Sequence, residues 1–164
     1  MSRAADPAYE SAARLLRTAE GAGATLAVAE SLTGGRLAAA LTAVPGASAV
    51  VLGGVVAYSP EMKRDLLGVP ATLIETHGVV SAECARAMAT GVRAVTGATY
   101  GVSTTGVAGP EPSEGHPVGT VFVGVDGPGG TTALALELTG DRATIQARTV
   151  AEALGALADR LAEG

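Results

Sequence analysis

The sequence predicts a single-domain layered α/β/α fold over residues 1–164, built around a mixed sheet of about five strands. Helical patterns alternate with short apolar runs that are typical of buried strands, and a two-stranded hairpin follows the third run. Aromatic residues make up only 2% of the chain, so Ala, Val and Leu must fill the core. Helix and sheet layers are therefore expected to pack closely, around one core of the size that 164 residues allow.

The helices are predicted from capping residues and from apolar residues at helical spacing. Asp6 before Pro7, and Ser59 before Pro60, each place a capping side chain ahead of a proline at the first helical position. Ser81 is expected to cap a further helix. The expected helices are 7–21, one from about 36 to 44, 60–67, 71–76, 82–96, and a last one that begins at 142.

The strands are predicted from apolar runs bounded by turn residues. The run over 50–58 is rich in Val and is expected to be buried on both faces, with a bulge or a close backbone approach at Gly53 and Gly54. A turn of about five residues, 126–130, is expected to join two antiparallel strands. The expected strands are 25–29, 50–58, 99–104, 121–125 and 131–138.

Charge and composition exclude several classes of function. The net charge is −5 and the eleven Lys and Arg residues are scattered, so non-specific nucleic-acid binding is not expected. The apolar runs are too short to span a bilayer and no signal peptide is recognised, so a cytoplasmic location without membrane binding is expected. The single cysteine, Cys84, rules out an internal disulfide and a cysteine-based metal cluster, and it is expected to be a small packed residue.

The turn after the first strand is the first candidate site. Glu30, Ser31, Thr33, Gly34 and Gly35 stand between a strand pattern and a helical pattern. A helix N-terminus there can hold an anion or an oxyanion on its free N–H groups, and Ser31 is then a candidate nucleophile. In the alternative interpretation, Ser31 or Thr33 only caps the helix and the glycines only turn the chain.

Polar residues follow two more of the predicted strands. Tyr58 and Lys63 flank the junction after the second strand, and Thr105 follows the third. Because ligands gather at the carboxyl ends of strands in open α/β sheets, these residues and Ser31 are expected to share one crevice.

Several separated motifs resemble the CinA C-terminal domain family, whose stand-alone members are nicotinamide-nucleotide amidases. AESLTGG resembles the family's AESCTGG, and GGVVAYSPEMK resembles its GGVVTYSNEAK. The resemblance runs from about Leu16 to Leu161 and also includes, in the same order, PGAS, LLGV, HGVVS, TTGVAGP, PVGTV and GDR.

The resemblance implies hydrolysis of the carboxamide of nicotinamide mononucleotide, without a metal or an organic cofactor. It implies that Ser31 is the nucleophile, Lys63 the base and Tyr58 a hydroxyl that assists proton transfer. A homo-oligomer is also expected, with a dimer favoured. The residues that the resemblance places near the substrate are Glu30, Thr33, Gly34, Gly35, Thr105, Gly106 and Arg142.

The chain departs from the family pattern at two places. Leu32 replaces a cysteine, which indicates a packing position. The loop 111–116 lacks the family's glycine-rich run, and we expect Pro112 to cost an amide donor and the carboxylates of Glu111 and Glu114 to repel a phosphate. Two alternatives follow: a non-catalytic nucleotide-binding or assembly domain, or an amidase for a less anionic amide.

Overall fold

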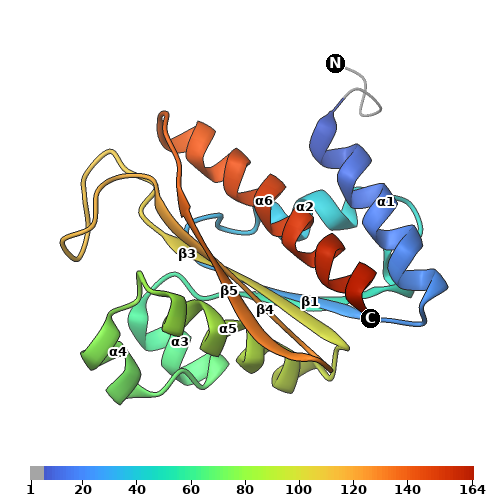
Figure 1. Cartoon of the computed structure of the whole chain (residues 1–164), viewed down its shortest axis with the longest axis horizontal. Helices are drawn as coiled ribbons and strands as arrows, with labels where there is room; N and C mark the ends of the chain where they lie inside the picture. The colour runs from blue at the N-terminus through green and yellow to red at the C-terminus, as the bar shows by residue number, and fades with distance from the viewer. Residues whose placement is uncertain (1–5) are drawn as a thin grey trace.

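A five-stranded mixed sheet lies between two layers of helices in the computed structural model, which describes residues 6–164 (Figure 1). Residues 1–5 of the predicted domain lie outside this description. The elements are α1 (Pro7–Gly21), β1 (Leu26–Glu30), α2 (Arg36–Thr42), the 3₁₀ turn η2 (Ala47–Ala49), β2 (Val51–Val56), α3 (Pro60–Leu67), α4 (Ala71–His77), α5 (Ala82–Thr96), β3 (Tyr100–Gly106), β4 (Thr120–Gly127), β5 (Gly130–Glu137) and α6 (Arg142–Glu163).

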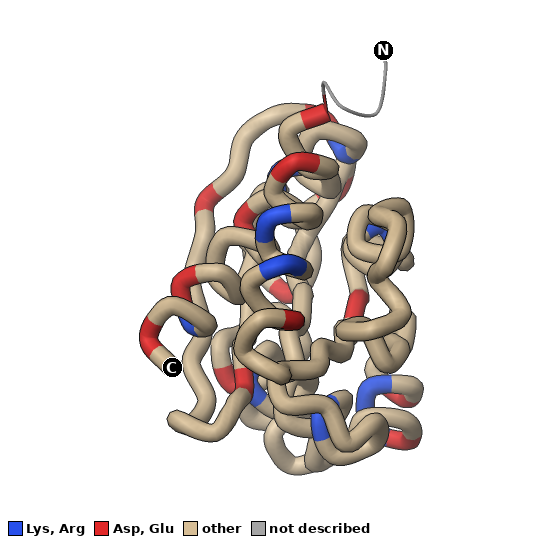
Figure 2. Tube along the Cα trace, turned by 90° about the vertical axis from the view of Figure 1, so that its right-hand side faces the viewer, with Lys and Arg blue, Asp and Glu red and all other residues tan. Residues whose placement is uncertain are grey.

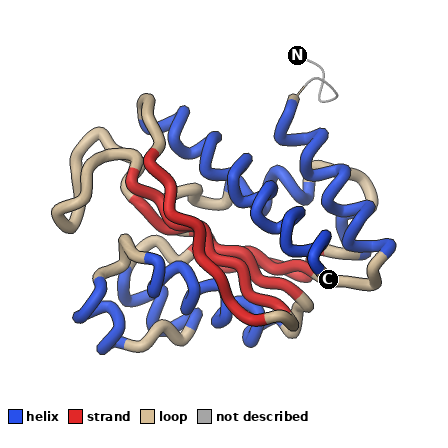
Figure 3. The backbone as a smooth tube through the Cα atoms, viewed as in Figure 1, coloured by secondary structure: helices blue, strands red, loops and turns tan. Residues whose placement is uncertain are grey.

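The strand order in the sheet is β2-β1-β3-β4-β5. Strands β2, β1 and β3 are parallel, whereas β4 is antiparallel to both of its neighbours. Helices α1, α2 and α6 cover one face and α3, α4 and α5 cover the other (Figures 1 and 3). The predicted layered fold with a mixed sheet is therefore confirmed.

The two faces of β1 belong to two different cores. Leu26 and Val28 pack in the core under α1, α2 and α6, whereas Ala27 and Ala29 pack in the core that includes Met88 of α5. Helix α5 lies very close to the sheet. A Cβ atom on Gly101 would lie 2.4 Å from the backbone oxygen of Ala89, and one on Gly124 would lie 2.3 Å from that of Ala85. The expected close packing of the layers is confirmed.

Strand β2 differs from the prediction because it is an edge strand. Leu52 is 49% exposed and Val56 is 50% exposed, so the expectation of burial on both faces is wrong. The expected irregularity is confirmed, since the pairing register with β1 shifts between Val51 and Gly53. A Cβ atom on Gly54 would lie 2.5 Å from the side chain of Val28, which explains the glycine there.

The hairpin between β4 and β5 is tighter than predicted. Gly127 pairs with Gly130, so only residues 128–129 form the loop in place of the expected five residues. Asp126 belongs to β4 and pairs with Thr131 of β5. The Asp126 carboxylate also accepts a hydrogen bond from the Thr131 hydroxyl at 2.6 Å.

The charged residues are scattered over the structure, as the sequence indicates. In the view of Figure 2, Lys and Arg positions are interspersed with Asp and Glu positions and form no basic stripe. Over residues 6–164, none of the helices is both long and apolar enough to cross a membrane.

Candidate active site

The pairing of the parallel strands brings three strand ends together. The Ala57 N–H donates to the Glu30 carbonyl at 2.9 Å, and the Ser31 N–H donates to the Thr104 carbonyl at 3.1 Å. Ser31 therefore lies between the ends of β2 and β3. A cavity of about 410 Å³ opens at this edge of the sheet, and its lining includes Ser31, Tyr58, Lys63, Thr105, Gly106 and Arg142. The expected common crevice is present.

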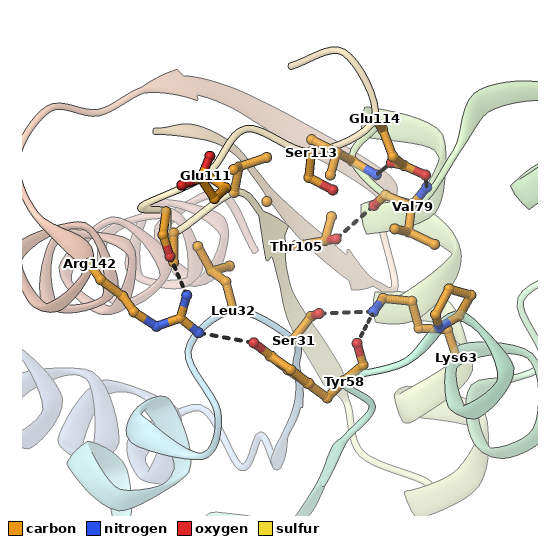
Figure 4. Close-up of a pocket in the computed structure, with 16 residues that line it drawn as sticks. Ser31, Leu32, Tyr58, Lys63, Val79, Thr105, Glu111, Ser113, Glu114 and Arg142 are labelled. Atoms are coloured by element: carbon orange, nitrogen blue, oxygen red, sulfur yellow. Dashed lines mark hydrogen bonds between the residues drawn. The ribbon is translucent and has the colours of Figure 1, made fainter. Parts of the chain in front are cut away.

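A serine and a buried lysine are in contact at the floor of the cavity. The Nζ atom of Lys63 lies 2.8 Å from the Oγ atom of Ser31 (Figure 4). Nζ also donates to the carbonyl oxygens of Ala57 at 2.9 Å and of Tyr58 at 3.4 Å. Lys63 is only 1% exposed and Ser31 only 7% exposed. Three oxygen atoms of the protein thus surround one amine that is shielded from water.

Burial lowers the pKa of Lys63 below its ordinary value of 10.5, because an ammonium loses its hydration there. The negative charges of an ionised Cys84 and of Glu114 act in the opposite direction, but burial is the largest effect. A neutral amine has two N–H groups and one lone pair. The carbonyls of Ala57 and Tyr58 can accept both hydrogens, which leaves the lone pair for the Ser31 hydroxyl.

Local sequence places Lys63 at this position. The Ser59 hydroxyl caps α3 by accepting from the Met62 N–H at 3.2 Å, and Pro60 occupies the first turn, as predicted. Lys63 follows near the N-terminus of α3, where the helix dipole also disfavours an ammonium.

Cys84 is fully buried, as expected of a packed residue, and burial raises the pKa of its thiol to about 11.

Tyr58 and Arg142 meet at the mouth of the cavity (Figure 4). The Nη2 atom of Arg142 donates to the Tyr58 hydroxyl at 2.9 Å, and its Nη1 atom donates to the Gly109 carbonyl. Arg142 is the first residue of α6, whose cap is Asp141. The Tyr58 hydroxyl thus lies against Arg142, and it is the backbone carbonyl of Tyr58 that contacts Lys63.

Thr105 uses its hydroxyl hydrogen within the protein. Its Oγ1 atom donates to the Val79 carbonyl at 2.7 Å. Because Thr105 also lines the cavity, only the lone pairs of its oxygen remain for a ligand. Thr105 can therefore accept a hydrogen bond from a bound molecule but has no hydrogen left to donate.

The N-terminus of α2 is occupied by the protein itself, which corrects the expectation of an anion site there. Glu30 is fully buried, and its carboxylate accepts from the N–H groups of Leu37 at 2.8 Å and Ala38 at 2.9 Å. An internal carboxylate already pairs with the positive end of this short helix. The expected placement of Glu30 near the substrate is not supported by this geometry.

Three neighbouring residues also lie outside the cavity lining. Thr33 is fully buried and its hydroxyl is 2.8 Å from that of Thr104, so it neither caps α2 nor lines the cavity. Gly35 is the N-cap residue, with φ of 101° and no side-chain cap, and Gly34 is also left-handed. The alternative interpretation, a cap from Ser31 or Thr33, is therefore also wrong, because Glu30 provides the cap.

Both glutamates of the loop 111–116, Glu111 and Glu114, line the cavity. Glu114, which was expected to repel a phosphate, accepts from the N–H groups of Val79 at 3.1 Å and Val80 at 2.8 Å. Pro112 is not among the lining residues. Leu32 is 3% exposed and packs, as expected.

No local sequence pattern predicts three contacts that hold the site residues in place. Gln146 of α6 donates to the Leu32 carbonyl at 3.0 Å and so holds the turn that carries Ser31. The carbonyl of Ala57 and the peptide of Val79 also hold site residues. Composition alone could have singled out Lys63, because it is the only lysine among the eleven basic residues of the chain.

Within residues 6–164, no group of three or more His, Cys, Asp and Glu residues is arranged to hold a metal ion.

Fold and site together define an α/β protein with a buried Ser–Lys pair at the carboxyl edge of a mixed sheet. The chain belongs to the CinA family, whose C-terminal domain matches residues 8–161. It is 55% identical over 131 residues to the CinA-like protein of Frankia casuarinae, which covers 80% of this chain and 30% of that protein. The chain thus spans about a third of the length of the curated relatives it matches.

Solved structures of the superfamily have the same fold. The CinA superfamily protein from Klebsiella pneumoniae 700603 superimposes with a TM-score of 0.94 at 37% identity, over 97% of this chain and 100% of that chain. The competence/damage inducible protein CihA from Agrobacterium tumefaciens superimposes with a TM-score of 0.89 at 36% identity, over 94% of each chain.

Proposed function

We propose that the protein is an amidase that hydrolyses nicotinamide mononucleotide to nicotinate mononucleotide and ammonia. The observation that carries the proposal is the 2.8 Å contact between the Ser31 hydroxyl and the buried Lys63 amine. A serine hydroxyl needs an adjacent base, and a lysine serves as that base when its pKa is depressed. The identity of the substrate is inferred from the resemblance to the family.

In the first half of the reaction, Lys63 takes the hydroxyl proton while the Ser31 Oγ atom bonds to the carboxamide carbon. The carbonyl oxygen becomes an oxyanion. When the C–N bond breaks, Lys63 returns the proton to the departing nitrogen, and ammonia leaves an ester on Ser31. The Thr105 oxygen is an acceptor for an N–H of the carboxamide, which favours an amide over an ester at this position.

In the second half, water replaces ammonia. Lys63 takes a proton from the water as its oxygen attacks the ester carbon, and it then protonates the Ser31 oxygen as the C–O bond breaks. The product is a carboxylate. Arg142 lies at the cavity mouth and supplies the only permanent positive charge among the lining residues, so we assign it to the phosphate.

One observation favours a second candidate, an amidase for a less anionic amide. Glu111 and Glu114 line the same cavity as Arg142, so two carboxylates oppose the single guanidinium. A phosphate gains less from such a cavity than an uncharged group does.

A panel of amides tests the proposal. Ammonia release is measured with nicotinamide mononucleotide, nicotinamide riboside, nicotinamide and glutamine, for the wild type and for Ser31→Ala. We expect release from the mononucleotide that the Ser31→Ala variant lacks. Release only from the riboside, which lacks the phosphate, or from another amide without a phosphate would favour the second candidate. No release from any amide by the folded wild type would favour a non-catalytic binding or assembly domain.

A further inference from the structure

The loop 111–116 is fixed to the opposite side of the cavity by one side chain. The carboxylate of Glu114 accepts from two successive N–H groups, those of Val79 and Val80, in the connection between α4 and α5 (Figure 4). Glu114, Val79 and Val80 all line the cavity. Both hydrogen bonds are charge-assisted, and together they link the loop to that connection.

The backbone on both sides is shaped for this contact. Glu114 has φ of 51°, a left-handed conformation that is uncommon for a residue other than glycine. Gly78 leaves room for the carboxylate, since a Cβ atom at Gly78 would lie 2.9 Å from both carboxylate oxygens. The conformation that aims Glu114 at Val79 and Val80 therefore costs energy that the two hydrogen bonds offset.

The same peptide that Glu114 holds also holds a cavity residue. The Val80 N–H donates to Glu114 at 2.8 Å, and the Val79 carbonyl, which belongs to the same peptide group as that N–H, accepts the hydroxyl hydrogen of Thr105 at 2.7 Å. The position of the Val79 carbonyl decides where the hydrogen of Thr105 points. It therefore also decides which way the lone pairs of Thr105 face.

We propose that Glu114 is a positioning residue that acts through Val79 to keep the Thr105 oxygen aimed as an acceptor at the substrate carboxamide. This inference rests on the proposed amidase function. A carboxamide N–H is bound by Thr105 in the ground state and in the transition state alike. Loss of Glu114 therefore raises KM and leaves kcat nearly unchanged. A purely structural role would instead lower the fraction of active enzyme, which lowers apparent kcat at constant KM.

The variants are Glu114→Gln, which keeps the size but removes the charge, and Glu114→Gly, which suits the left-handed backbone and removes the side chain. Glu75→Gln, on the exposed side of α4, is the matched control. Each Glu114 variant is expected to raise KM about tenfold for the amide that the wild type hydrolyses, as for the loss of one hydrogen bond. The control leaves KM unchanged.

A double-mutant cycle with Thr105→Val tests the route. If Glu114 acts through Thr105, then Glu114→Gln raises KM in the wild type but not in the Thr105→Val background. Equal increases in both backgrounds, or no increase in the wild type, would overturn the proposal.

Hydrogen exchange at the Val79 and Val80 amides gives a readout that does not depend on catalysis. Both amides are expected to exchange faster in the two Glu114 variants than in the wild type and in Glu75→Gln. If the wild type hydrolyses no amide, the proposed function fails, and exchange alone then decides the Glu114 link. Unchanged protection of both amides from exchange would show that Glu114 does not hold Val79 and Val80, and lost protection would show that it does.

Discussion

Replacement of Glu30 by glutamine tests whether this carboxylate holds the turn on which Ser31 sits. Glu30 is fully buried, and its two oxygens each accept one N–H group, from Leu37 and from Ala38. Glutamine has nearly the same shape. It keeps one acceptor oxygen, but it has no charge and presents an NH₂ group to a backbone N–H.

The expected loss follows from the two contacts. A hydrogen bond to a charged group contributes about 1.5–3 kcal/mol, and one of the two is lost. The favourable interaction of the charge with the helix N-terminus, up to about 2 kcal/mol at a shielded site, is lost as well. The free energy of unfolding should therefore fall by about 3 kcal/mol. For a domain of this size, that corresponds to a decrease in Tm of roughly 6–12 °C.

Urea unfolding followed by circular dichroism measures the change. Glu10→Gln is the matched control, because Glu10 also lies in the first turn of a helix but is exposed. We expect the control to lose less than about 1 kcal/mol. If Glu30→Gln loses no more stability than Glu10→Gln, the capping role of Glu30 is refuted.

Three further predictions concern the cavity. Lys63→Arg should abolish ammonia release in steady-state assays, because a guanidinium with a pKa above about 12 does not act as a base; substantial turnover would mean that Lys63 only supplies charge. Since burial lowers the pKa of Lys63, the unfolded state binds more protons between the folded pKa and 10.5. The free energy of unfolding of the wild type, relative to that of Lys63→Met, should therefore rise with pH through this window in urea titrations at several pH values, and a difference that falls with pH would contradict the lowered pKa. Glycines at Glu111 and Pro112 should lower KM for nicotinamide mononucleotide more than for its riboside, with kcat little changed; equal changes for both substrates would show that this part of the loop does not affect phosphate binding.

Local signals were sufficient to predict the elements and the edge of the sheet at which the site lies. Ser59 and Pro60 define the start of α3 from sequence alone, and the structure has the expected cap. Because parallel strands end at one edge, the residues after β1, β2 and β3 could be assigned to one crevice before their distances were known. Neighbouring strand ends then bring Ser31 and Thr105 to the same cavity.

The errors concern properties that depend on contacts distant in sequence. The apolar composition of β2 says nothing of its place at the edge of the sheet, which exposes Leu52 and Val56. Glu30 bonds to N–H groups seven and eight residues further on, and only the folded turn brings them together. Glu114 bonds to Val79, 35 residues away, and no local pattern predicts that contact.

The protonation state of Lys63 tests the account most directly. Because Lys63 is the only lysine in the chain, protein labelled with ¹³C at lysine Cε gives one lysine signal, and a pH titration of that signal reports this amine alone. We predict a midpoint below 10.5 in the wild type, which makes the neutral amine available to Ser31 at lower pH than for an ordinary lysine. A midpoint at or above 10.5 would contradict the proposed role of Lys63 as a base.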